Sequence, residues 1–108
     1  MRRIMKIGGS LLLQPELPKV LNRWLDEQAP AQSIAIVGGG ELIDAMRGLD
    51  PVYRPGAAWT HWRCVDLLRT SFELLGPRLP GWRVDATDRA FQSLRQRDDP
   101  DDDSRHLL

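Results

Sequence analysis

The sequence predicts a small α/β fold in which helices cover a mainly parallel sheet on both faces, giving three αβα layers. Two short apolar runs, residues 4–7 and 33–37, each end in a glycine cluster, as buried strands bounded by turn residues do. Between them, apolar residues recur at helical spacing from Pro15 to Pro30. A strand, a helix and a second strand of these lengths form a βαβ unit, whose strands run parallel with a right-handed crossover.

The helix between the two strands has one apolar face and one charged face. Pro30 ends it, and the second strand follows at once. The apolar face consists of Leu17, Val20, Leu21, Trp24 and Leu25.

Two more helices are predicted after the second glycine cluster. The first covers residues 42–49 and ends at Asp50-Pro51, and the second runs from Ala57 to Leu75 before Gly76-Pro77. The apolar face of the second helix consists of Trp62, Val65, Leu68, Phe72 and Leu75. Packing in the core is the favoured role of the aromatic residues on such faces. They are Trp24, Trp62, Phe72 and Trp82.

The remaining chain contains weaker signals. Residues 82–84 fit a short third strand, and Thr87-Asp88 fits the cap of a helix that continues through Leu94. Residues 98–103 are five aspartates and a proline, a like-charge block that repels itself and buries nothing. We therefore expect one domain over residues 1–97 and an acidic flexible tail over residues 98–108.

Composition argues against several classes of protein. The 15 basic and 15 acidic residues balance, so no basic surface for nucleic acid is indicated. Cys64 is the single cysteine, and no Cys/His spacing indicates a metal site. The apolar stretch near the N-terminus is too short and too interrupted for a signal peptide or a membrane span. A cytoplasmic protein without nucleic-acid or membrane partners is expected.

The two glycine clusters are the main candidates for chemistry. Gly8-Gly9-Ser10 and Gly38-Gly39-Gly40 should meet at the carboxyl edge of the sheet, where their N–H groups can approach phosphate oxygens. Lys6 would supply positive charge there, as phosphoryl transfer requires. Neither cluster matches a P-loop or a dinucleotide motif. A lone cluster is about twice as commonly a simple turn, but two clusters after two strands favour phosphate binding.

Segments 6–11, KIGGSL, and 36–47, IVGGGELIDAMR, resemble the opening of the amino acid kinase family, which includes aspartate, acetylglutamate and uridylate kinases. Segments 59–62, WTHW, and 79–82, LPGW, look similar to its archaeal and planctomycete branch containing aminomethyl-furan-methanol phosphate kinase. The resemblance extends to about Trp82.

The resemblance implies half of an amino acid kinase fold and transfer of the ATP γ-phosphoryl group to a small-molecule acceptor, with Mg²⁺ arriving with ATP. It assigns Lys6 as the catalytic residue in contact with the transferring phosphate. It also implies a set of phosphate- and substrate-binding residues: Gly8, Gly9, Ser10, Gly38, Gly39, Gly40, Asp44, Arg47 and His61. His61 fits either an acid/base group or the start of the long helix, and its residue context slightly favours the structural role.

The family's C-terminal half, with its adenine pocket, has no counterpart after Val84. We therefore expect a truncated kinase, either active or inactive on its own. The alternative is a noncatalytic phosphate-ligand-binding or self-associating module, partnered by a second copy or a companion chain. A third possibility is a degraded fragment without a stable fold, since parallel sheets need cover on both faces.

Overall fold

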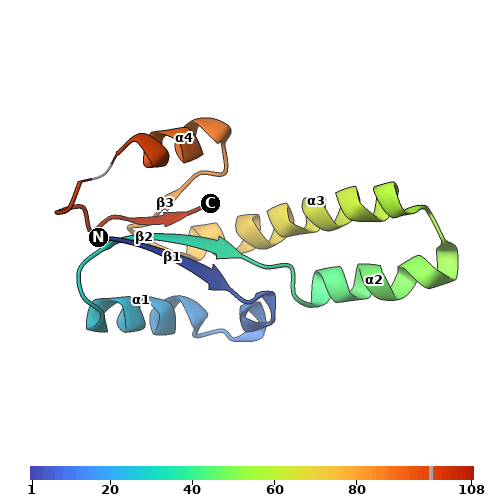
Figure 1. Cartoon of the computed structure of the whole chain (residues 1–108). Helices are drawn as coiled ribbons and strands as arrows, with labels where there is room; N and C mark the ends of the chain where they lie inside the picture. Colours follow the sequence, from blue (N-terminus) through green and yellow to red (C-terminus); the bar gives the residue numbers. More distant parts are fainter. Residues whose placement is uncertain (98) are drawn as a thin grey trace.

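The structure, a computed structural model, describes residues 1–97 and 99–108 and contains one parallel sheet of four strands in the order β1-β2-β4-β3 (Figure 1). The strands are β1 (Arg2–Ile7), β2 (Gln32–Val37), β3 (Arg83–Val84) and β4 (Arg105–Leu107). The α-helices are α1 (Leu17–Glu27), α2 (Glu41–Tyr53), α3 (Ala57–Leu75) and α4 (Asp88–Gln96), and two short 3-10 helices are η1 (Gly9–Leu13) and η2 (Gly76–Arg78). The small α/β class predicted from the sequence is confirmed.

The predicted βαβ unit is formed by β1, α1 and β2. The two strands pair parallel from Arg2 opposite Gln32 to Ile7 opposite Val37, so both end at the same level. Their following loops therefore emerge side by side at the carboxyl edge of the sheet. Both strands end where predicted, at Ile7 and Val37, and they begin one or two residues earlier than predicted. Helix α1 begins at Leu17 and ends at Glu27, three residues before Pro30.

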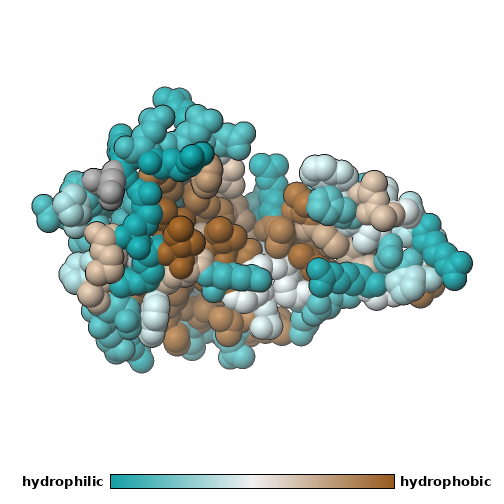
Figure 2. Space-filling model, viewed as in Figure 1, coloured by the Kyte–Doolittle hydropathy of each residue, from teal (hydrophilic) through white to brown (hydrophobic). Residues whose placement is uncertain are grey.

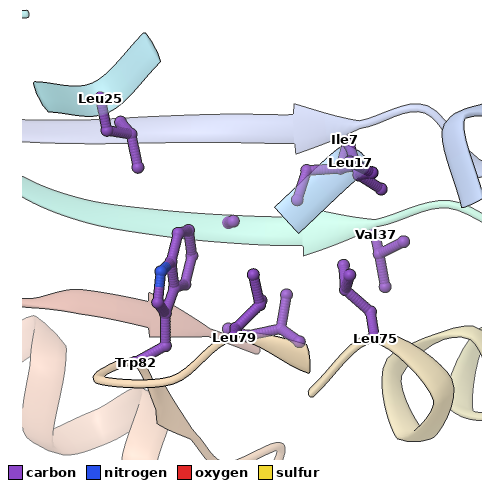
Figure 3. Packing of buried hydrophobic residues seen from close by; sticks show 9 residues of the cluster. Ile7, Leu17, Leu25, Val37, Leu75, Leu79 and Trp82 are labelled. Atoms are coloured by element: carbon purple, nitrogen blue, oxygen red, sulfur yellow. The ribbon is translucent and has the colours of Figure 1, made fainter. Parts of the chain in front are cut away.

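The hydrophobic core lies on one face of the sheet (Figure 3). Strand residues such as Ala35 and Leu107, both fully buried, pack there against α1, the end of α3 and the chain that follows it. On the opposite face lies α4, whose Leu94 is buried. The guanidinium of Arg2 reaches from the sheet to α4 and donates to the carbonyl oxygen of Leu94 at 2.5 Å and to that of Arg97. The three-layer arrangement is thus present.

The expectation of a flexible tail over residues 98–108 is wrong for residues 105–107. Residues 105–107 form β4, which lies between β2 and β3 and hydrogen-bonds to both. Leu107 and His106 are buried. Asp98 lies outside the described residues. Two features of the sequence concealed β4. The acidic block dominates the local composition, and a strand of three residues is too short to produce a period-two pattern.

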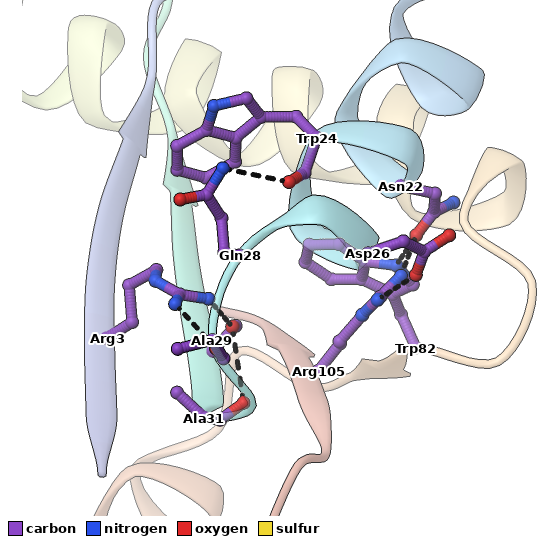
Figure 4. A network of polar contacts seen from close by, with 10 residues as sticks. Arg3, Asn22, Trp24, Asp26, Gln28, Ala29, Ala31, Trp82 and Arg105 are labelled. Carbon is purple, nitrogen blue, oxygen red and sulfur yellow. Dashed lines mark hydrogen bonds and ion pairs between the residues drawn. The ribbon is translucent and has the colours of Figure 1, made fainter.

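A polar network attaches β4 to α1 (Figure 4). Arg105 donates to Asn22 Oδ1 at 2.7 Å and to Asp26 Oδ1 at 2.5 Å. The indole N–H of Trp82 donates to the same Asn22 oxygen at 2.8 Å. One side chain of α1 therefore holds both the C-terminal strand and the loop that precedes β3. Of these residues the sequence patterns singled out only Trp82, as a core aromatic, and not Asn22, Asp26 or Arg105.

Helices α2 and α3 form a hairpin that projects beyond the sheet (Figure 1). The radius of gyration, 15.8 Å, exceeds the value of about 13 Å expected for a compact chain of this length. Only the end of α3 reaches the core, so Trp62 is 64% exposed, contrary to the predicted core role. Trp24 is also exposed, whereas Trp82 is buried and Phe72 packs against the core.

The helix predicted over residues 42–49 is longer than expected, because α2 continues past Pro51 to Tyr53. A proline removes its own N–H donor and its ring crowds the carbonyl four residues back, but the residues after it can still donate to carbonyls four residues back. The helix ends at Arg54, which adopts a left-handed conformation with φ of 50° and donates its N–H to Asp50 O at 2.8 Å. The predicted third strand and the Thr87 cap are confirmed, since the Thr87 hydroxyl accepts from Ala90 N–H at 3.2 Å.

His106 lies on the α4 side of β4 with its Nε2 atom 2.7 Å from Ser104 Oγ. Burial lowers the pKa of His106 below its ordinary value of 6.5, and the Arg83 guanidinium lowers it further, while Asp102 partly opposes this shift. His106 is therefore held in its neutral form near neutral pH.

We predict that Leu107→Ala lowers the free energy of unfolding by about 2–5 kcal/mol, because it opens a cavity at a fully buried position. Leu13→Ala is the matched control, and we expect a change below about 0.5 kcal/mol because Leu13 is exposed. Urea denaturation measures both. Equal effects of the two substitutions would contradict the placement of β4 in the sheet.

We also predict that stability falls as the pH is lowered from about 7.5 to about 5. Below pH 6.5 the unfolded chain takes up a proton that native His106 resists, so the free energy of unfolding rises with pH in this window. His106→Gln should flatten this slope, whereas His61→Gln, at an exposed position, should preserve it. Denaturation midpoints across the window provide the measurement. If the dependence of stability on pH were unchanged in His106→Gln, the lowered pKa of His106 would not be its cause.

Candidate functional site

The loops after β1 and β2 contact each other through their backbones. Gly38 N–H donates to Ile7 O at 2.8 Å, which extends the strand pairing into the loops. A Cβ atom on Gly9 would lie 2.1 Å from Gly40 N, and one on Gly40 would lie 2.4 Å from Gly9 C. Gly40 also has a φ of 53°, which favours glycine. Glycine is therefore required at both positions for the two loops to meet.

Beside these loops is an open hollow of about 370 Å³. Eight of the ten predicted site residues line it: Lys6, Gly8, Gly9, Gly38, Gly39, Gly40, Asp44 and Arg47. Strand β1, both loops and α2 thus contribute to one site. The sequence spacing placed the glycine clusters and Lys6 at the same edge of the sheet, and the family resemblance added Asp44 and Arg47. The structure brings these residues around one space.

Four apolar residues that line the hollow were not predicted as site residues, namely Ile36, Val37, Ile43 and Leu68. Ile36 lies opposite Lys6 in the strand register and shares its face of the sheet, while Ile43 and Leu68 come from α2 and α3. Pairing of the two strands could have identified Ile36 as a neighbour of Lys6. Leu68 was identified only as part of the apolar face of its helix, because its place at the hollow depends on how α3 returns along α2.

Two predicted residues do not line the hollow. Ser10 is exposed in η1. His61 is exposed on the first half of α3, where its ring packs edge-on against Trp62 with centroids 5.1 Å apart. The neighbouring Thr60 donates to Asp50 Oδ1 at 2.5 Å, which places this part of α3 beside the far end of α2. The geometry therefore supports a structural position for His61.

Positive charge at the hollow is not neutralised within the described part of the chain. Neither Lys6 nor Arg47 has a carboxylate within ion-pair distance there. The N–H groups of Gly39 and Gly40 also make no hydrogen bond to any described residue. These groups lie where α2 begins, and the positive end of a helix dipole attracts anions. The site offers two cations and backbone donors to an anionic ligand.

Acidic side chains at the hollow determine which metal ion it could bind. Glu41 and Asp44 occupy the first turn of α2, and Asp44 lines the hollow. Residues 1–97 and 99–108 contain no cluster of three or more His, Cys, Asp or Glu side chains that could hold a metal ion. One carboxylate beside phosphate oxygens is sufficient for Mg²⁺, which keeps several waters. The donor set therefore fits a magnesium ion that is bound together with phosphate oxygens.

No helix within the described part of the chain is sufficiently long and hydrophobic to cross a bilayer. Comparisons with protein-family models, with curated proteins and with solved structures found no match to this chain. The resemblance to amino acid kinases thus rests on the glycine motifs and their surroundings.

We predict that Gly9→Ala lowers the free energy of unfolding by about 1–3 kcal/mol, because the added Cβ meets the backbone of the opposite loop, which must shift. The control is Gly48→Ala in α2, where a Cβ meets nothing within 4 Å. That substitution should raise the free energy of unfolding by about 0.5–1 kcal/mol. Chemical denaturation of both variants gives the comparison. A stabilising Gly9→Ala would show that the loops do not touch.

Proposed function

We propose that the hollow binds the terminal phosphates of ATP and that the chain is an ATP-dependent phosphotransferase of the amino acid kinase family, acting on a small-molecule acceptor in the cytoplasm. The observation that carries this proposal is the contact between the two glycine loops, with Lys6 and Arg47 at the same hollow. A phosphate group carries the charge and the acceptor oxygens that these cations and N–H groups would satisfy.

Each group has a distinct role in this proposal. Lys6 would stabilise the negative charge of the transferring phosphoryl group, and Arg47 would bind a phosphate or the acceptor. The N–H groups of Gly39 and Gly40 would hold phosphate oxygens at the start of α2. Asp44 would ligate Mg²⁺, which neutralises phosphate charge when it is bound. In the transfer, an acceptor oxygen bonds to the γ-phosphorus while the bond to the bridging oxygen breaks and ADP leaves.

One observation favours the noncatalytic alternative, a phosphate-ligand-binding module. Asp44 is the only carboxylate among the residues that line the hollow, and His61 lies elsewhere on α3. Among the described residues that line the hollow, none besides Asp44 could act as a general base, and in this proposal Asp44 ligates magnesium. Binding without turnover would be the property of such a module.

We predict that Mg-ATP binds saturably and that Lys6→Ala weakens binding about tenfold or more, because a charge-assisted hydrogen bond is lost. Lys19→Ala is the control, since Lys19 is an exposed lysine of α1 paired with Glu16. Isothermal titration with Mg-ATP and with ADP measures the affinities. Normal ATP binding by a folded Lys6→Ala variant would contradict the role of the lysine.

Turnover separates the kinase from the binding module. A screen of small acceptors by phosphorus NMR would detect ADP formed together with a phosphorylated product. Binding with no product from any acceptor would favour the module, and no binding by a folded chain would contradict both.

A further inference from the structure

Strand β1 lies at one edge of the sheet. The carbonyl oxygens of Met1 and Ile7 face inward, since they accept from Gln32 N–H at 3.0 Å and from Gly38 N–H at 2.8 Å. Backbone groups of successive residues point to alternate sides of a strand. The N–H and C=O groups of Arg2, Ile4 and Lys6 therefore point away from β2. Such a row of unpaired donors and acceptors is a template for another strand.

Apolar surface borders this row on both faces of the sheet. On the face shared with α4, Ile4 is 71% exposed and Ile36 is also exposed, and Figure 2 shows hydrophobic side chains gathered over the strands between α1 and α4. On the other face, a hollow of about 330 Å³ separates β1 from α1. Its apolar lining includes Met5, Leu11, Val20, Leu21 and Trp24. A strand added to β1 would contact apolar groups with side chains on both of its faces.

Charge identifies the kind of strand that fits. Strand β1 carries Arg2, Arg3 and Lys6 and no acidic residue. Arg2 and Arg3 donate to carbonyl oxygens and to neutral side chains, and none of the three cations pairs with a carboxylate among residues 1–97 and 99–108.

A second copy of β1 is a poor partner for this edge. It would bring three more cations into the ribbon, and pairing centred on Ile4 would place Arg2 opposite Lys6. Like charges opposite each other destabilise a strand pair. Carboxylates at the same positions would stabilise it.

We propose that β1 is a docking edge for an extended acidic strand of another polypeptide. The strand pairs antiparallel with Arg2, Ile4 and Lys6, through the mode by which edge strands bind peptides. Its carboxylates lie opposite Arg2 and Lys6, and its apolar side chains lie opposite Ile4 and over the hollow beside α1. This interaction does not require ATP at the glycine loops.

The test is a titration of the ¹⁵N-labelled chain with the peptide Ser-Glu-Val-Ile-Val-Glu-Ser, blocked at both ends. We expect the amide signals of Arg2, Ile4 and Lys6 to shift more than those of Arg3 and Met5, because only the former face the peptide. A matched peptide with lysine in place of both glutamates should bind about tenfold or more weakly. Unperturbed signals in β1, or equal binding of the two peptides, would overturn the proposal.

Two variants test the backbone and side-chain contributions separately. Ile4→Pro removes an outward N–H without removing a bond to β2, so we expect about tenfold weaker binding at an unchanged melting temperature. Ile4→Thr retains the N–H and should bind at an intermediate level, and it provides the test if the proline variant is unfolded. Wild-type affinity in a folded Ile4→Pro or Ile4→Thr variant would overturn the proposal. Self-association through β1 in the absence of peptide would do so as well.

Discussion

The core and the hollow of this molecule both depend on the parallel pairing of β1 with β2. The two strands are in register up to Ile7 and Val37, so two glycine loops leave the sheet at the same level. The loops then pack so closely that a side chain on Gly9 or Gly40 would collide with backbone atoms. A shift of register by one residue would separate the loops and move Lys6 to the other face of the sheet. Both the core and the hollow therefore depend on this one alignment.

The glycines serve packing and ligand access at once, and these two roles can be distinguished. Gly9 and Gly40 are required by contact between the loops, whether or not a ligand binds. Gly8 is different, because a Cβ there would have only the Ser10 hydroxyl within 4 Å. Lys6 and Arg47 provide the argument for an anion that the glycines alone cannot give, because no carboxylate neutralises either cation within the described part of the chain.

Sequence patterns predicted the βαβ unit and most of the hollow because both depend on local signals, apolar runs and glycines, placed by a strong topological rule. They were wrong for β4, where three residues after an acidic block give no periodicity, and for Trp62, whose apolar helix face extends past the sheet. The Asn22 network and Leu68 depend on contacts between distant segments. Local patterns contain no information about such contacts until the topology is known.

The position of β4 has a consequence for how the chain folds. The inner edge of β2 stays unpaired until residues 105–107 are synthesised, about 70 residues after the segment with which they pair. Closing contacts of such long range is slow, and open apolar strand edges in incomplete chains promote aggregation. Nascent chains should thus pass through an interval in which the backbone groups of Ser33 and Ala35 form an open edge. Shielding by chaperones during synthesis would matter more for this protein than the small size of its sheet suggests.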